Sequence, residues 1–242
     1  MCIRDRLKWA RSEGCPWDEG TCEYAAKNGH LEILKWARSE GCPWNYETCE
    51  SAAFGGHLEI LKWAIPQGCP WYEMICRNAA NKGHLEVLKY LRSEGCPLDE
   101  GVCTEAANKG HLEVLKYLRS EGCPWNEDVC TGSAKNGHLE ILKYAISEGC
   151  PHDERMYYHV ADNKHMEFFR WAVSSEGPWD IENVGFMAAT SGHLAIINWV
   201  KSQGCPWDEA KGCPWHEKPE KDSVLLELIS KSRSRSWVNC IE

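Results

Sequence analysis

Hydrophobic residues recur three and four positions apart along most of this chain, which is the spacing of one face of an α-helix. In residues 17–43, Cys22, Ala25 and Ala26 form a narrow apolar face of small side chains, and a wider apolar stripe follows over 31–39. No part of this segment alternates between apolar and polar positions as a half-buried strand does. The pattern therefore predicts two short helices and no strand.

Polar and turn-forming residues mark the ends of these two helices. Asp18 is a good N-cap for the first helix because its carboxylate can accept a backbone N–H that the first turn leaves unpaired. Gly29 supplies the left-handed residue that ends this helix, and Gly41 and Pro43 end the second. The position of Asp18 is held further along the chain by a comparable polar residue, namely Asn45, Asp99, Asn126, Asp153 and Asp180.

The same two-helix pattern repeats with a period of 27 residues. The first marker of the period is a Gly-His pair, found at 29–30, 56–57, 83–84, 110–111 and 137–138. The second is a Cys-Pro pair, found at 15–16, 42–43, 69–70, 96–97, 123–124 and 150–151. Helices this short are marginal alone, so each unit must bury its apolar faces against its neighbours. The sequence predicts an all-α solenoid of helix-turn-helix repeats.

Two stretches of the unit resemble the ankyrin-repeat family over residues 7–207. Gly-His-Leu-Glu-Ile-Leu-Lys at 29–35 is similar to the second half of an ankyrin repeat, and Ala-Ala-Lys-Asn-Gly-His at 25–30 matches that family's Ala-Ala-x-x-Gly-His. Ankyrin repeats have about 33 residues, and the residues missing here are those of the family's β-hairpin finger. The resemblance implies a short, finger-less array that binds proteins through its first helices, with each histidine bridging backbone between units.

Composition and charge restrict the possible partners. A formal net charge of −9 disfavours nucleic acid, because phosphate binding needs a basic face. No apolar run is long enough to cross a membrane, and no secretory signal is visible at the N-terminus. We therefore expect an intracellular monomer, cytoplasmic or nuclear, that binds a protein.

The recurring cysteines and histidines do not have the spacing of a metal site or an active site. There is no Cys-x-x-Cys, so we expect buried, free thiols that act as small hydrophobic side chains; a ladder of disulfides is the alternative. An active site needs one set of catalytic residues that occurs at a single place in the chain, whereas here Ser, His and Asp recur in every unit. We predict no cofactor, no metal and no enzymatic activity.

Variable positions on the first helices are the candidate binding surface. The positions equivalent to Glu23 and Tyr24 change from unit to unit while the apolar frame stays constant, and Phe54 replaces a polar residue. The exposed aromatics Tyr24 and Phe54 could be interface anchors, or Phe54 could instead cover a neighbouring repeat. The full candidate set is Glu23, Tyr24, Ser51, Phe54, Arg77, Asn78 and Glu105.

The two ends of the chain depart from the period. Residues 1–6 read like the translated end of a sequencing transposon, so we expect a non-native scar and an array that continues upstream. Residues 208–242 form an irregular, charged tail that is a possible cap. The alternative function is a spacer or targeting segment of a larger protein whose effector domain is missing from this chain.

Overall fold

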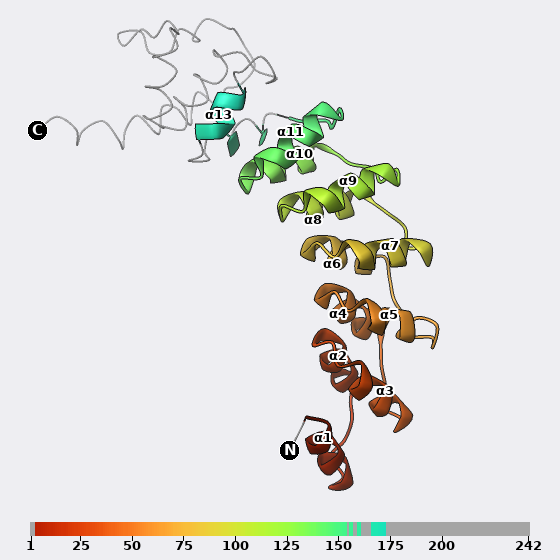
Figure 1. Cartoon of the computed structure of the whole chain (residues 1–242). Coiled ribbons are helices and arrows are strands. Elements are labelled where there is room, and N and C mark those ends of the chain that lie inside the picture. The colour runs from red at the N-terminus through yellow and green to blue at the C-terminus, as the bar shows by residue number, and fades with distance from the viewer. Residues whose placement is uncertain (1–2, 154, 157–158, 161–165, 173–242) are drawn as a thin grey trace, which may run out of the picture. The chain divides into compact units, whose positions relative to one another are not determined.

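A computed structural model describes residues 3–153, 155–156, 159–160 and 166–172 of the chain. Within these residues the regular structure is entirely helical (Figure 1). The chain divides into two compact units, residues 1–153 and 154–242, and the described helix of the second is α13 (Met166–Ala172). The prediction of an all-α fold is confirmed for the described part.

The helices of the first compact unit alternate as the period predicts. The chain starts with α1 (Ile3–Ser12). The first helices of the repeats are α2 (Glu19–Lys27), α4 (Tyr46–Gly55), α6 (Met74–Lys82), α8 (Glu100–Asn108) and α10 (Glu127–Lys135). The second helices are α3 (Leu31–Ser39), α5 (Leu58–Ala64), α7 (Leu85–Ser93), α9 (Leu112–Ser120) and α11 (Leu139–Ser147).

The predicted N-caps begin most of the first helices. Asp18 accepts a hydrogen bond from Thr21 N, and Asp99 accepts one from Val102 N. Asn45 and Asn126 serve α4 and α10 in the same way. Tyr72 occupies the equivalent position before α6, which starts later and has no side-chain cap. A first helix therefore begins directly after its capping residue, and it begins later where that residue is missing.

The helix ends also follow the sequence. The glycine of each Gly-His pair adopts a left-handed conformation, with φ between 74° and 84° in the five units 17–43, 44–70, 71–97, 98–124 and 125–151. Pro66 falls in what would be the last turn of α5, and that helix stops at Ala64. A proline there removes a backbone donor and clashes with the preceding turn, so the early end was predictable.

Neighbouring helices pack in sequence order. The first helices contact one another successively, α2 with α4, α4 with α6, α6 with α8 and α8 with α10, and each also packs on its own second helix. Figure 1 shows the two sets of helices along opposite sides of residues 17–151. The small face predicted for the first helix is the packed one, with Cys22, Ala25 and Ala26 all buried.

The tryptophan after each of the first two Cys-Pro links packs against the second helix of the unit that follows. Trp17 lies 5.3 Å from Trp36, and Trp44 lies 5.7 Å from Trp63, measured between ring centroids. The Arg38 guanidinium lies 4.1 Å from the Trp44 ring and also donates to the carbonyl oxygen of Cys42. These contacts fix the link at Trp44 between two second helices, α3 through Arg38 and α5 through Trp63.

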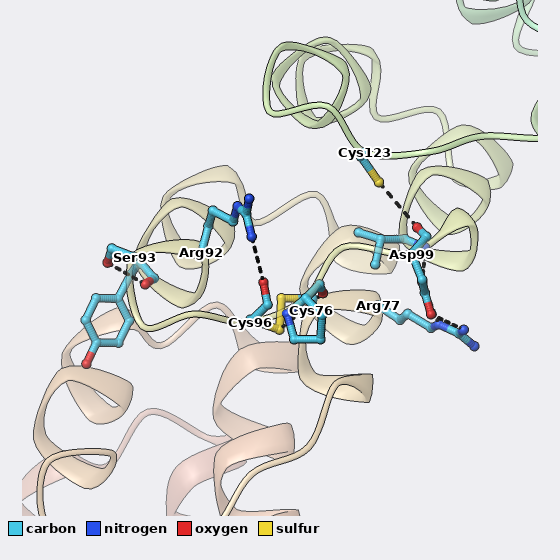
Figure 2. Close-up of a disulfide and its surroundings, with 10 residues drawn as sticks. Cys76, Arg77, Arg92, Ser93, Cys96, Asp99 and Cys123 are labelled. Atoms are coloured by element: carbon cyan, nitrogen blue, oxygen red, sulfur yellow. Dashed lines mark hydrogen bonds and ion pairs between the residues drawn. A yellow bond between two sulfur atoms is a disulfide. The ribbon is translucent and has the colours of Figure 1, made fainter.

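One expectation about the cysteines is wrong. Cys76 and Cys96 form a disulfide, with their Cα atoms 6.9 Å apart (Figure 2). The helix pair brings the chain back so that the link lies beside the first helix of the same unit. Comparing equivalent cysteines from unit to unit does not reveal this contact within a unit.

Several predictions concern residues outside the described ranges. These are the tail 208–242, the cap position Asp180, residues 1–2 of the expected scar, and the part of the array from 173 to 207. Among the residues that the structure describes, no helix is long and apolar enough to cross a membrane.

Candidate protein-binding surface

The candidate residues come together on consecutive first helices. Glu23 and Tyr24 belong to α2, Ser51 and Phe54 to α4, Arg77 and Asn78 to α6, and Glu105 to α8. These helices pack side by side in chain order (Figure 1). The candidate residues therefore follow one another from helix to helix as one strip across the stack. We call this set of seven residues the first-helix strip.

Tyr24 is the most exposed member of the first-helix strip. Its side chain is 66% accessible, whereas Cys22, Ala25 and Ala26 on the same helix are buried. The side-chain hydrogen bond at its backbone is local, since Asn28 Nδ2 donates to the Tyr24 carbonyl oxygen at 2.7 Å. The ring is therefore available to a second molecule without any rearrangement of α2.

Phe54 contacts the following unit as well as solvent. Its side chain is 38% accessible, and the Lys82 ammonium lies 4.3 Å from the centre of its ring. The Phe54 carbonyl oxygen also accepts a hydrogen bond from His84 Nε2 at 3.1 Å. A cation over an aromatic ring is attractive, so Phe54 helps to join its unit to the next one.

The remaining members of the first-helix strip are half-buried and polar. Ser51 Oγ donates to Glu23 Oε1 at 3.4 Å, so these two candidates contact each other across the boundary between two units. Asn81 Nδ2 donates to Glu105 Oε2 at 2.6 Å across a later boundary. Sequence reasoning treated these positions as exposed, but in the structure they also connect adjacent first helices.

Arg77 forms an ion pair with Asp99, the residue that caps the next first helix. Arg77 Nε donates to Asp99 Oδ1 at 3.2 Å, and Nη2 donates to Oδ2 (Figure 2). The bond from Arg77 lowers the pKa of Asp99, and the same bond raises the pKa of Arg77. The pair thus favours the charged carboxylate that also accepts the N–H of Val102.

The structure exposes a second group of apolar side chains that sequence reasoning missed. Tyr46, Tyr72 and Met74 lie where α4 and α6 begin, with accessibilities of 38%, 58% and 43%. The rings of Tyr46 and Tyr72 are 5.1 Å apart. A signal was available, because Tyr72 replaces the Asp or Asn of other units and Tyr46 replaces Glu.

The histidines of the Gly-His pairs hold the units together. In four of them, Nε2 donates to a carbonyl oxygen 30 residues earlier: His57 to Lys27, His84 to Phe54, His111 to Asn81 and His138 to Asn108, at 3.0–3.2 Å. A carbonyl can only accept, so Nε2 carries the proton. This use of the imidazole is the one that the sequence resemblance implied.

The described residues offer bonds between units and the exposed first-helix strip. Within this part of the chain, no three or more His, Cys, Asp or Glu side chains are arranged as a metal site. Neither the family models nor the curated proteins with which the sequence was compared match it.

Proposed function

We propose that the chain is a non-catalytic protein-binding scaffold, an ankyrin-like solenoid of short repeats whose first helices contact the partner. The observation that carries this proposal is Tyr24, an aromatic ring left 66% exposed on α2, whose small apolar residues Cys22, Ala25 and Ala26 are buried. Aromatic residues of this kind are enriched among the residues that dominate binding energy.

The sequence variation supports the same proposal. Apolar frame positions repeat almost unchanged. The position of Tyr24 holds a different residue in each of the five units from 17 to 151, and the position of Glu23 holds Glu, Arg or Thr. A constant frame with variable decoration lets a repeat array present a surface of its own. The fold alone names no partner, because function depends on the site.

The second candidate function is a spacer or targeting segment of a larger protein. One observation favours it: Ser51, Arg77 and Glu105 each already contact a residue of a neighbouring unit. Variation at such positions can reflect how adjacent units fit each other, with no partner involved.

A pair of matched variants separates the two candidates. Tyr24→Ala combined with Phe54→Ala removes both aromatics of the first-helix strip. Tyr72→Ala is the control, since Tyr72 is 58% exposed but lies outside this strip. Proteins captured from the source cells by the full chain are quantified for each variant, and stability is measured by chemical denaturation.

For a binding strip, the double variant changes the free energy of unfolding by under about 1 kcal/mol. The amount of captured partner also falls by more than about tenfold in the double variant, whereas it is unchanged in Tyr72→Ala. If the unaltered chain, the double variant and Tyr72→Ala capture equal amounts of partner, the first-helix strip is not a binding site. The spacer or targeting segment would then be the better candidate function. Unfolding of the double variant would instead assign the two rings a structural role.

A further inference from the structure

Each repeat places two buried cysteines against each other. One comes from the first helix and the other from the Cys-Pro link that closes the same unit. The pairs are Cys22 with Cys42, Cys49 with Cys69, Cys76 with Cys96, Cys103 with Cys123, and Cys130 with Cys150, each 20 residues apart. All ten thiol positions are at most 3% exposed.

The five pairs lie at equivalent positions of their units but differ in oxidation state. Cys76 and Cys96 are joined as a disulfide, and the other four pairs are free thiols. In those four, the two thiols are in hydrogen-bonding contact with each other. The same turn and link therefore accommodate both the dithiol and the disulfide.

The link cysteine is held in place by the first helix of its own unit. Cys42 Sγ donates to the Asp18 carbonyl oxygen at 3.5 Å, and Cys123 Sγ makes the same contact with Asp99 at 3.3 Å (Figure 2). Cys69 and Cys150 bond to Asn45 and Asn126 in the same way. These four link sulfurs are thus fixed beside the start of the helix that carries their partner.

We propose that the cysteine pair of each unit is a dithiol–disulfide redox site, which a low-molecular-weight disulfide such as oxidised glutathione converts into a cross-link within that unit. This inference is independent of the protein-binding proposal. It also differs from a ladder between units, because every bond joins a first helix to its own link.

The chemistry balances through two exchange steps. The link thiolate attacks one sulfur of oxidised glutathione, forms a mixed disulfide and releases one glutathione thiolate. The first-helix thiol then gives up its proton and attacks the link sulfur, which forms the cystine and releases the second glutathione. Two cysteine thiols are oxidised, and one glutathione disulfide is reduced to two thiols.

The electrostatics give the two cysteines different roles. The hydrogen bond from Cys103 lowers the pKa of Cys123 and raises that of Cys103. Cys69 and Cys49 show the same asymmetry. Because the thiolate is the nucleophile, the link cysteine is the attacking group in these two pairs, and the first-helix cysteine resolves the mixed disulfide. In the first unit, burial raises the pKa of both Cys22 and Cys42. The link is also flanked by exposed residues, such as Gly122 and Pro124, so a local opening there gives access.

A peptide map of the full chain tests the pairing. The protein is fully reduced, incubated with oxidised glutathione under native conditions, and blocked with iodoacetamide in denaturant before digestion without reductant. We expect joined peptides for all five pairs, each with the loss of two hydrogen atoms, and their disappearance after reduction. Cross-links between different units, or stable glutathione adducts without joined peptides, would overturn the proposal.

Two variants sharpen the test. In Cys123→Ser, Cys103 loses its partner and should enter no cross-link, while the other four pairs still form. Cys15→Ser is the matched control, because Cys15 lies in a Cys-Pro link but is exposed and belongs to none of the five pairs. It should leave every pair intact. If Cys123→Ser fails to fold, the peptide map of the unaltered chain still decides. A disulfide between Cys103 and a cysteine of another unit would contradict the assignment.

Discussion

Among single residues, the histidine that follows each left-handed glycine makes the clearest bond between units. His111 Nε2 donates to the Asn81 carbonyl oxygen at 3.1 Å. Replacing His111 by Ala leaves that carbonyl without its partner, and we expect a loss of about 1–2 kcal/mol in the free energy of unfolding. Urea denaturation followed by circular dichroism measures the loss.

His30 provides the matched control for this prediction. It holds the same position in unit 17–43 and precedes α3 as His111 precedes α9, but its side chain is exposed. His30→Ala should therefore change stability by less than about 0.5 kcal/mol. Equal losses for the two variants would mean that the imidazole acts within its own helix and not between units.

The ion pair of Arg77 with Asp99 makes part of the stability depend on pH. Its bond to Arg77 lowers the pKa of Asp99 from an unfolded value of about 3.9. The contribution is thus present above that pH and is lost as pH falls through the lower, folded value. Both side chains are more than a third exposed, so the contribution is under about 1 kcal/mol.

We therefore expect the stability difference between the unaltered chain and Arg77→Met to shrink below about pH 4. It should also shrink in high salt, because exposed charges are screened. Arg119→Met is the control: that guanidinium lies 3.9 Å from the Trp125 ring and donates to the Cys123 carbonyl oxygen. A difference for Arg77→Met that stays constant down to pH 3 would show that the arginine acts by packing.

At the scale of helices and turns, the Gly-His junction combines a backbone requirement with a steric one. Gly83 has φ +76°, and a Cβ there would lie 2.6 Å from His111 Nδ1. Gly95 has φ +88°, with nothing within 4 Å of an added Cβ. Gly95→Ala should cost about 1–2 kcal/mol for the left-handed backbone alone.

Gly83→Ala should cost more than Gly95→Ala, because it also displaces the His111 ring and its hydrogen bond. Thermal or urea denaturation of the two variants gives the comparison directly. Closely similar losses would show that the histidine ring moves aside without cost.

The helices themselves were largely predictable, because their signals are local. Asp18, Gly29 and Gly41 mark helix ends by their own backbone chemistry, and Pro66 shortens α5 for the same reason. Contacts across units were less predictable. The bond of Arg77 to Asp99 and the pairing of Cys76 with Cys96 depend on how one helix lies over another, which the period does not specify.

The candidate surface shows the same division. The sequence identified Tyr24 and Phe54 as aromatics in polar positions, and the structure leaves both exposed. The sequence did not indicate that Ser51 and Glu105 bond to adjacent units. These bonds depend on which side chains face each other on neighbouring first helices. Variation along a sequence therefore locates a surface without separating partner contacts from contacts within the stack.

For the molecule as a whole, the repeat predicts that one complete unit can be removed. Deleting 71–97 brings unit 44–70 directly against unit 98–124. His111 then takes the place of His84 and can donate to the Phe54 carbonyl oxygen that His84 now contacts. The Arg77–Asp99 and Asn81–Glu105 contacts are lost, but each interface keeps its apolar frame.

We expect this deletion to keep the helical content per residue and a cooperative melt, at a lower melting temperature. The control deletes 85–97, which removes α7 and its link and puts α8 where a second helix belongs. A first helix has a narrow face of small residues and cannot fill that place, so apolar surface becomes exposed and the transition broadens. Circular dichroism and binding of an apolar dye measure both effects. If the two deletions behave alike, whether both fold or both unfold, the 27-residue segment is not the unit of stability.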